Sequence, residues 1–346
     1  MRGARKRQVA ELLRRSGALG AARRLRAGVL RRPALFILGY HRVAAASPPF
    51  SPLTVTPAAF AAQIGYFARH CDVWPLARLA GWRREPEALR RDTVVITFDD
   101  GYADNHANAA PILERYGVPA TFFVTTGPVR RGGRLWWDDL RDALEAPDAG
   151  RALAAAAVDG PVAALLRAYL ADAGGQRPAI ARRILATLQH APEAQRDGLL
   201  EALSRSRRED APARPARPAP PPDLLTPAQV ADLARRGFGI GAHGVTHASL
   251  PTLDPRRLAE EVEGALADLR ALGIETRVFA YPYGDAGEPG GAVEQAMAGA
   301  GVTLAVTTEE RAARPDDAPL RLPRKVVPDQ TLGQLATRLE RLAWGR

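Results

Sequence analysis

Hydrophobic runs of strand length alternate with stretches of helical periodicity along most of the chain. The first part predicts strands over Pro33–Tyr40, Val73–Leu76, Thr93–Phe98 and Ala120–Val124, with helices over Pro57–His70 and Asn105–Tyr116. A strand, a helix and a further strand in this order form the β-α-β unit that is typical of parallel sheets. The pattern therefore indicates an α/β protein.

The same alternation returns after Leu225. It predicts helices over Pro227–Arg236, Pro255–Leu272 and Gly291–Ala300, and strands over Phe238–Ala242, Arg277–Tyr281, Val302–Val306 and Leu320–Val326. About seven or eight strands in total suit a barrel or a wound sheet. In both folds the active site lies at the carboxyl ends of the strands.

A segment of different composition, at about 141–222, separates the two parts. Ala, Leu and Arg dominate it as far as Leu203, and the Pro-rich stretch APARPARPAPPPD follows, which cannot form a helix or a central strand. We interpret the segment as a helical insertion closed by an extended linker. Just before it, Trp136 and Trp137 lie in an expected loop, where they either stack on sugar faces or seat the insertion.

The net charge of +10 is concentrated at the N-terminus. Residues 1–42 contain twelve Arg and Lys side chains and one acid, Glu11, so they carry +11 and the other 304 residues sum to −1. Residues 1–34 have apolar side chains at roughly helical spacing among the arginines, which predicts a basic amphipathic arm. Two interpretations stay open: attachment to an anionic membrane surface or acidic partner, and a solvated arm on the domain formed by residues 35–346.

Apolar runs and cysteine content limit the cellular setting. No run of about 18 apolar residues occurs in the sequence, which excludes a spanning helix. Residues 33–40 are too short and lie too late for a secretory signal, so we expect a cytoplasmic protein. Contact of its arm with the inner membrane face belongs to the first of the two interpretations above. The single cysteine, Cys71, excludes an internal disulfide and a Cys-rich metal site.

Two carboxylates follow one of the predicted strands, in the sequence Thr97-Phe98-Asp99-Asp100-Gly101-Tyr102. The glycine permits a tight turn that brings both acids toward one site. Two carboxylates in one place allow one to bind a cation while the other keeps a basic lone pair. A plain turn is the alternative, because Asp and Gly are favoured turn residues.

Two further polar clusters also follow strands. His243 and His247 occur in HGVTH, and on one face of a helical turn their Cβ atoms would lie about 5–6 Å apart, close enough to chelate one ion. Two imidazoles and one carboxylate, with a position open for water, are typical of a catalytic metal site. The sequence FAYPYGD at Phe279–Asp285 is, by itself, as consistent with a plain turn as with a functional site.

The motifs TFDDGY, HGVTH and FAYPYGD, in this order and each at a strand end, resemble the polysaccharide deacetylases, the NodB-homology family or carbohydrate esterase family four. The resemblance covers residues 35–140 and 223–330. It implies a distorted (β/α) barrel that holds one divalent metal ion, usually zinc, and removes acetyl groups from N-acetylated sugars. By position it implies these roles: Asp99 as general base, Asp100, His243 and His247 as metal ligands, and the backbone amide of Tyr283 as a donor to the oxyanion.

The chain departs from the common family pattern in three places. Phe279-Ala280-Tyr281 stand where an arginine often precedes the Pro-Tyr turn, and Arg324 is the candidate to orient Asp99 instead. Gly244 stands where many relatives have Ser or Thr. No histidine follows His247, although the family usually takes its general acid from a late Leu-x-His segment.

His41 is our candidate for that acid. It follows the first predicted strand in Gly39-Tyr40-His41-Arg42-Val43, on the same rim as the other clusters. The sequence resembles a branch of the family, which includes exopolysaccharide deacetylases, in which an early Tyr-His motif supplies the acid. A structural role is the alternative, because a lone histidine beside a strand is more often structural.

The sequence thus predicts a metal-dependent hydrolase that removes acetyl groups from a polysaccharide or glycan precursor. In the expected reaction Asp99 takes a proton from the attacking water, and protonated His41 donates one to the departing sugar amine. Two other classes remain: a non-catalytic carbohydrate-binding protein on the same fold, and a nucleic-acid-binding protein that uses the basic arm. The neutral body and the lack of a recognition module argue against nucleic acid.

Overall fold

The computed structural model describes most of the chain. The described residues are 8, 10–12, 20–21, 33–45, 53–84, 89–145, 160–172, 174–189, 191, 195–202, 223–288 and 290–344. Most of the basic arm and the Pro-rich stretch as far as residue 222 lie outside them, so the predictions made there stay predictions. The chain divides into two compact units, of which the second is centred on Gly133–Pro222.

The first unit is built on one parallel sheet. Its strands are hydrogen-bonded in the order β10-β1-β5-β6-β7-β8-β9, and β4 pairs with β5 beside this path. They are β1 (Leu35–Tyr40), β4 (Asp72–Val73), β5 (Thr93–Phe98), β6 (Ala120–Val124), β7 (Gly239–Ala242), β8 (Val278–Ala280), β9 (Leu304–Val306) and β10 (Lys325–Val326). A separate pair consists of β2 (Arg42–Val43) and β3 (Thr54–Val55).

The last segment of the sheet joins its two edges. Leu322 forms a parallel bridge with Val306 of β9, and its backbone N–H donates to the Ala305 carbonyl over 2.8 Å. Three residues later, Lys325 pairs with Leu38 of β1. The sheet therefore curls into a distorted barrel, which confirms the fold class predicted from the sequence.

Alternation along the central strands divides their side chains between two apolar layers. On one face, Ile37, Val95 and Phe123 belong to a buried cluster that also includes residues of β8 and β9, as expected for a barrel interior. On the other face, Tyr40 and Phe98 stack with ring centroids 5.6 Å apart. Because both faces are buried, these strands consist of almost continuous apolar residues.

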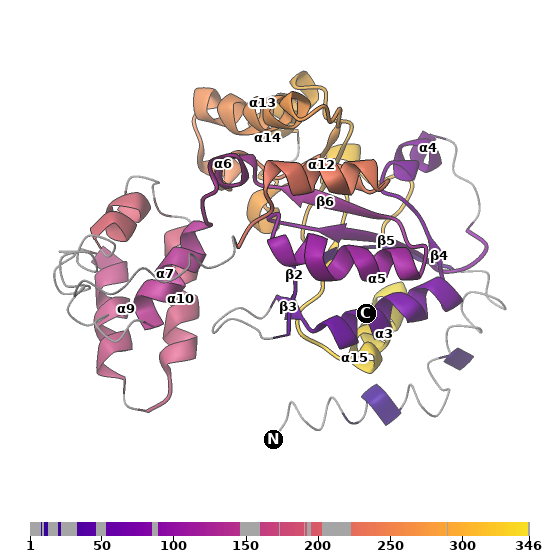
Figure 1. The fold of residues 1–346 in the computed structure, drawn as a ribbon, viewed down its shortest axis with the longest axis horizontal. Helices are drawn as coiled ribbons and strands as arrows, with labels where there is room; N and C mark the ends of the chain where they lie inside the picture. The colour runs from indigo at the N-terminus through magenta and orange to yellow at the C-terminus, as the bar shows by residue number, and fades with distance from the viewer. Residues whose placement is uncertain are drawn as a thin grey trace. The chain divides into compact units, whose positions relative to one another are not determined.

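Helices cover the outer face of the sheet, and Figure 1 shows α3, α5 and α12 alongside the strands. The longer helices of the first unit are α3 (Pro57–His70), α4 (Arg78–Arg84), α5 (Ala110–Arg115), α6 (Thr126–Arg131), α12 (Pro227–Arg235), α13 (Pro255–Ala271), α14 (Ala292–Gly299) and α15 (Leu332–Ala343). Short turns are η2 (Asn105–Ala109), η3 (Leu250–Thr252), η4 (Pro282–Gly284) and η5 (Pro319–Arg321). Phe60 of α3 makes edge contacts with the rings of Tyr40 and Phe98, which fixes this helix on the sheet.

Helix starts follow local sequence signals. Thr226 caps α12 in a capping box with Gln229, and Thr331 caps α15 in the same way with Gln334. Asp254 caps α13 by accepting from the Arg257 N–H over 2.9 Å. The caps of α12 and α13 explain why these helices begin at the predicted residues, Pro227 and Pro255, whereas α15 was not predicted from the sequence.

Several sequence-based expectations differ from the structure. Trp136 and Trp137 lie in a helix, α7 (Trp136–Glu145), not in a loop, and the second unit begins at Gly133, before the expected boundary near 141. The expected strand Leu320–Val326 is reduced to β10, since Pro323 has no N–H to donate to a ladder. The expected helix Asn105–Tyr116 begins with one π-helical turn, η2, before α5.

The second unit is helical in its described part, which consists of α7, α9 (Gly160–Ala171), α10 (Arg177–Gln189) and the helical residues 195–202. Trp136 is buried within it, with the guanidinium of Arg196 5.5 Å from its ring centroid. Asp138 and Arg141 form a buried ion pair over 2.7 Å. Burial of Trp136 favours the interpretation that it seats the insertion.

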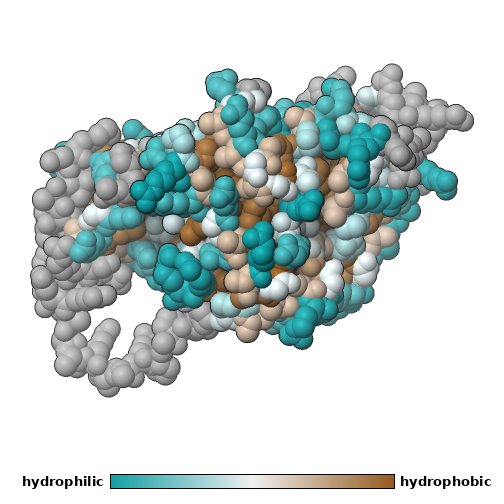
Figure 2. Space-filling view, turned by 90° about the horizontal axis from the view of Figure 1, so that it is seen from above, coloured by the Kyte–Doolittle hydropathy of each residue, from teal (hydrophilic) through white to brown (hydrophobic). Residues whose placement is uncertain are grey.

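The surface of the described residues is mixed in polarity. Figure 2 shows hydrophilic side chains spread over one face, between smaller hydrophobic areas. Among the described residues, the large hydrophobic side chains that stand exposed are Leu12 and Trp344. In the same part of the chain, no helix has the length and apolar character needed to cross a bilayer.

Gly241 provides a test of the packing inside the barrel. A Cβ at this position of β7 would overlap the Phe123 ring and lie 3.0 Å from the Val278 side chain. We expect Gly241→Ala to lower the free energy of unfolding by about 1–3 kcal/mol, measured by urea denaturation. Gly81→Ala in α4 is the matched control: its Cβ meets nothing within 4 Å, so stability should stay equal or rise by about 0.4–1 kcal/mol. Equal urea midpoints for wild type and Gly241→Ala would contradict this packing.

Candidate metal centre and catalytic site

Three side chains from two strand ends converge on one point. Asp100, His243 and His247 each offer a ligand atom, and these atoms all lie within 4.8 Å of one another. Asp100 Oδ1 is 3.5 Å from Nε2 of His243 and 3.4 Å from Nε2 of His247. All three residues are buried. Among the described residues, no other group of three His, Cys, Asp or Glu side chains has this geometry.

The turn after β5 directs both carboxylates into the site. Asp100 and Gly101 have φ values of 74° and 82°, and the Gly101 N–H donates to the Asp99 carbonyl over 2.9 Å. A positive φ costs glycine little, but it strains an aspartate, so Asp100 is held in this conformation by its surroundings. Asp99 continues the inward face of Thr97, and the turn keeps Asp100 from pointing outward as simple alternation would require.

The two histidines are not on a helix, so the reason that we expected for their proximity is wrong. Residues 243–249 form a loop in which Gly244 has a φ of 77° and His247 a φ of 63°. The ring centroids nevertheless lie 4.7 Å apart. His243 Nδ1 lies 2.7 Å from the Ala280 carbonyl, so this nitrogen carries the proton and Nε2 is left as the metal-facing atom.

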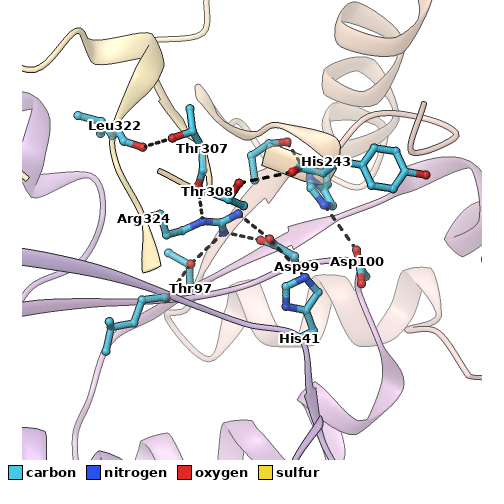
Figure 3. A network of polar contacts seen from close by, with 12 residues as sticks. His41, Thr97, Asp99, Asp100, His243, Thr307, Thr308, Leu322 and Arg324 are labelled. Atoms are coloured by element: carbon cyan, nitrogen blue, oxygen red, sulfur yellow. Dashed lines mark hydrogen bonds and ion pairs between the residues drawn. The ribbon is translucent and has the colours of Figure 1, made fainter. Parts of the chain in front are cut away.

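Asp99 forms a buried, bidentate ion pair with Arg324. The Arg324 Nη1 and Nη2 atoms each donate to one carboxylate oxygen of Asp99 over 2.6 Å. Nη1 also donates to the Thr97 hydroxyl over 3.2 Å, and Nε donates to the Thr307 carbonyl over 3.1 Å. The guanidinium lies against Gly39, where a Cβ would come within 3.2 Å of it. Figure 3 shows this network beside Asp100 and His243.

Opposing charges set the protonation of the site. Burial alone raises the pKa of Asp99, but the charges of Arg324, His243 and His41 outweigh burial, so this pKa lies below its usual value. Burial likewise raises the pKa of Asp100, and the contacts with His243 and His247 bring it far below its usual range. Both carboxylates are therefore ionised at neutral pH, and Asp100, which has no arginine partner of its own among the described residues, can offer an oxygen to a cation.

The two imidazoles titrate differently. Burial lowers the pKa of His243, but Asp99 and Asp100 outweigh burial and raise it. Burial also lowers the pKa of His247, and the neighbouring His243 adds to this effect, so the pKa stays lowered in spite of Asp100. His247 is thus neutral at pH 7, which is the form that binds a metal.

His41 follows β1 and lies near the Asp99 carboxylate. Its Nε2 lies 3.9 Å from Asp99 Oδ2, and its buried Nδ1 has no hydrogen-bond partner among the described residues. The Asn105 amide donates to the His41 carbonyl over 2.8 Å, and Asp104 accepts from the Val43 N–H over 2.9 Å. The π-helical turn that follows the Asp-Asp-Gly motif therefore anchors the backbone on both sides of Arg42.

Tyr283 lies beside the triad. It has a φ of 60°, and its ring packs edge-on against His247 with a centroid distance of 4.5 Å. Its carbonyl accepts a hydrogen bond from the Thr308 hydroxyl over 3.5 Å. The turn Pro282–Gly284 thus places the Tyr283 backbone next to the candidate metal ligands.

Sequence reasoning missed several residues that hold this site. Thr97 and Thr307 orient Arg324, Asn105 holds His41, and Glu261 accepts hydrogen bonds from the loop between the two histidines. A signal existed for Glu261: it lies three residues after Leu258 and four before Ala265, on the apolar face of its helix. No local pattern distinguishes the threonines, because their partners lie far away along the chain.

A family model matches the parts of the chain that contain these motifs. The model of the polysaccharide deacetylase family matches residues 87–153 and 203–305, which include Asp99, Asp100, His243, His247 and Tyr283. This chain belongs to that family. Over 31 residues it is also 58% identical to YxkH of Bacillus subtilis (strain 168), a match that spans 9% of this chain and 11% of that protein.

Solved structures share the fold of the family. The Streptococcus pyogenes deacetylase PplD, in complex with acetate, is 18% identical with a TM-score of 0.57, over 88% of this chain and 98% of that one. IcaB from Ammonifex degensii is 21% identical with a TM-score of 0.56, over 89% and 97%. A de-N-acetylase from Aggregatibacter actinomycetemcomitans is 14% identical with a TM-score of 0.53, over 88% and 99%.

Substitution of Arg324 tests the electrostatics of the site through the pKa of Asp99, without an activity assay. We expect Arg324→Met to raise the pKa of Asp99, because the charges of His243 and His41 are then left to oppose burial without the arginine. Arg324→Lys keeps the charge but loses the fork of donors, so its increase should be smaller. Carboxyl ¹³C NMR titration of the metal-free protein measures both values. An Asp99 pKa that stayed at the wild-type value in Arg324→Met would contradict the pairing.

Proposed function

We propose that this chain is a metal-dependent hydrolase that removes N-acetyl groups from a polysaccharide or glycan precursor. The observation that carries the proposal is the position of Asp99, an ionised carboxylate held by Arg324 beside a buried Asp-His-His cluster. Membership of the polysaccharide deacetylase family supports the substrate class. The shared fold of a solved de-N-acetylase supports the choice of an N-acetyl group.

The donor set of the cluster fits a divalent metal ion. Asp100 offers a carboxylate oxygen and His243 and His247 offer imidazole nitrogens, which is a set that zinc and several other divalent ions accept. A metal ion bound to them would polarise the acetyl carbonyl and lower the pKa of a bound water. We take zinc as the ion, from the resemblance described above.

Asp99 serves as the general base in this proposal. Its lowered pKa keeps it in the carboxylate form at neutral pH, ready to accept a proton from the attacking water. The two hydrogen bonds from Arg324 fix the plane of the Asp99 carboxylate. The oxygen lone pairs that do not accept from Arg324 therefore point in a fixed direction. A fixed base needs little reorganisation during the reaction.

Two further groups complete the proposed reaction. The Tyr283 backbone N–H donates to the oxyanion, and a strained φ of 60° is the kind of conformation that aims a peptide group at a ligand. His41, on the other side of Asp99, donates a proton to the sugar nitrogen, since an amine leaves slowly without one. Acetate and the free amino sugar are the products.

The setting of the reaction rests on the sequence. A cytoplasmic location stays a prediction from the sequence. Membrane contact through residues 1–34 also stays a prediction, and the charge of +11 on residues 1–42 supports it. The alternative of a non-catalytic carbohydrate-binding protein is distinguished by turnover of an N-acetylated sugar.

Two substitutions separate metal binding from turnover. We expect His243→Ala to lose both the metal and the activity, because it removes a ligand. Asp99→Asn should keep the metal and lose activity by about 10²–10⁴-fold, because it removes the base and leaves the three metal ligands in place. Elemental analysis and an acetate-release assay on N-acetylglucosamine oligomers measure the two effects. If Asp99→Asn emptied the site and Asp100→Asn kept its metal, the two roles would be reversed.

The role of His41 is tested by changing the leaving group. His41→Ala should lower turnover of an N-acetylated sugar by about 10²–10⁴-fold, because the amine then departs without its proton. Hydrolysis of 4-nitrophenyl acetate should change little, because nitrophenolate needs no proton to leave. His70→Ala, an exposed histidine at the end of α3, is the control and should affect neither rate. An equal loss on both substrates would remove His41 as the acid.

A further inference from the structure

Glu261 is an acidic residue in a buried position, where a charge is unfavourable unless it is compensated. It is fully buried on α13, yet it accepts from the Val245 N–H over 2.9 Å, from the Thr246 N–H over 2.9 Å and from the Thr246 hydroxyl over 2.7 Å. The nearest charged partner that pairs with it, Arg257, is 3.8 Å away. Burying a charged group is costly unless hydrogen bonds compensate it, and here the loop between the two histidines supplies them.

The same loop is held from its other side by α6. The Thr126 N–H donates to the Gly244 carbonyl over 3.1 Å, and the Gly127 N–H donates to the Val245 carbonyl over 2.8 Å. The peptide groups between His243 and His247 are thus bound on both sides. The Thr126 hydroxyl in turn donates to Asp268 of α13 over 2.7 Å.

Glu261 and Asp268 are therefore two polar contacts by which α13 holds this region. They are seven residues apart, or about two helical turns, and so lie on the same face of the helix. One helix holds the histidine loop directly through Glu261, and indirectly, by way of α6, through Asp268.

Gly244 allows the close approach of loop and helix. Its φ is 77°, and a Cβ there would lie 2.8 Å from Glu261 Oε2. A side chain at this position would push the carboxylate away from the two N–H groups. This contact gives a physical reason for a glycine at position 244.

We propose that Glu261 is a positioning residue for the metal site: it sets the spacing of His243 and His247 through the backbone between them. This inference rests on the proposed function only in requiring that the two histidines bind a metal. Glu261 touches neither the ligand atoms nor the reacting groups. It lowers the cost of bringing both imidazoles toward Asp100, because the loop already has the metal-binding conformation before the ion arrives.

Glu261→Gln is the direct test, with Glu263→Gln as its matched control. The glutamine keeps the size of the side chain, but its NH₂ group cannot accept from the loop, whereas Glu263 is exposed on the same helix. Affinity for Zn²⁺ is measured by competition with a chromogenic chelator. We expect Glu261→Gln to weaken binding by about 10–100-fold and Glu263→Gln to leave it unchanged.

Amide hydrogen exchange in the metal-free protein supplies a second readout. The Val245 and Thr246 amides should exchange faster in Glu261→Gln, while those of β7 keep their protection. If Glu261→Gln fails to fold, Gly244→Ala decides instead, since its Cβ displaces the same carboxylate, and it should weaken Zn²⁺ binding and speed exchange at the same two amides.

The outcomes separate this inference from the proposed function. Wild-type Zn²⁺ affinity and unchanged exchange in Glu261→Gln would overturn the role of Glu261 alone. A wild-type protein that binds Zn²⁺ but releases no acetate would overturn the deacetylase chemistry and leave the role of Glu261 intact. A wild-type protein that binds no Zn²⁺ would overturn both.

Discussion

The ion pair between Asp99 and Arg324 joins two parts of the barrel that lie far apart in sequence. Its partners lie 225 residues apart, one at the end of β5 and the other on the segment that links β9 to β1. Breaking such a buried pair by removing one partner costs about 3–5 kcal/mol, because the other charge is left unpaired. The same contact therefore supports the closure of the sheet and fixes the orientation and charge of the candidate base.

The rest of the site is assembled around this pair by segments that carry no catalytic group themselves. The loop with both histidines is held between α6 and the Glu261 side chain of α13, and the backbone at His41 is held by the π-helical turn after the Asp-Asp-Gly motif. Hydrogen bonds to backbone groups restrain a loop more strongly than a single side-chain contact does, because they fix successive peptide planes. The positions of the site residues at the strand ends thus depend on the contacts of α6, α13 and the π-helical turn as well as on the barrel.

Much of this protein was accessible from its sequence. Strand-length apolar runs and helical periodicity are local signals, so the α/β alternation and the barrel class were predicted, with errors at element ends where Pro323 interrupts a strand. Asp100, His243 and His247 were also predicted as one cluster, because the carboxyl ends of parallel strands meet at one rim. The expected helical turn between the histidines was wrong, since a spacing of four residues does not reveal the positive φ values at Gly244 and His247.

What the sequence by itself determined was the order of the elements and the kinds of chemical group placed at their ends. Only the tertiary structure decided how those groups are held. The bond from Arg324 to Asp99 and the contact of Glu261 with Thr246 depend on which way side chains point after the sheet has curled and the helices have packed. Side-chain direction across such distances is set by packing and hydrogen bonding in three dimensions, and no local pattern of residues encodes it.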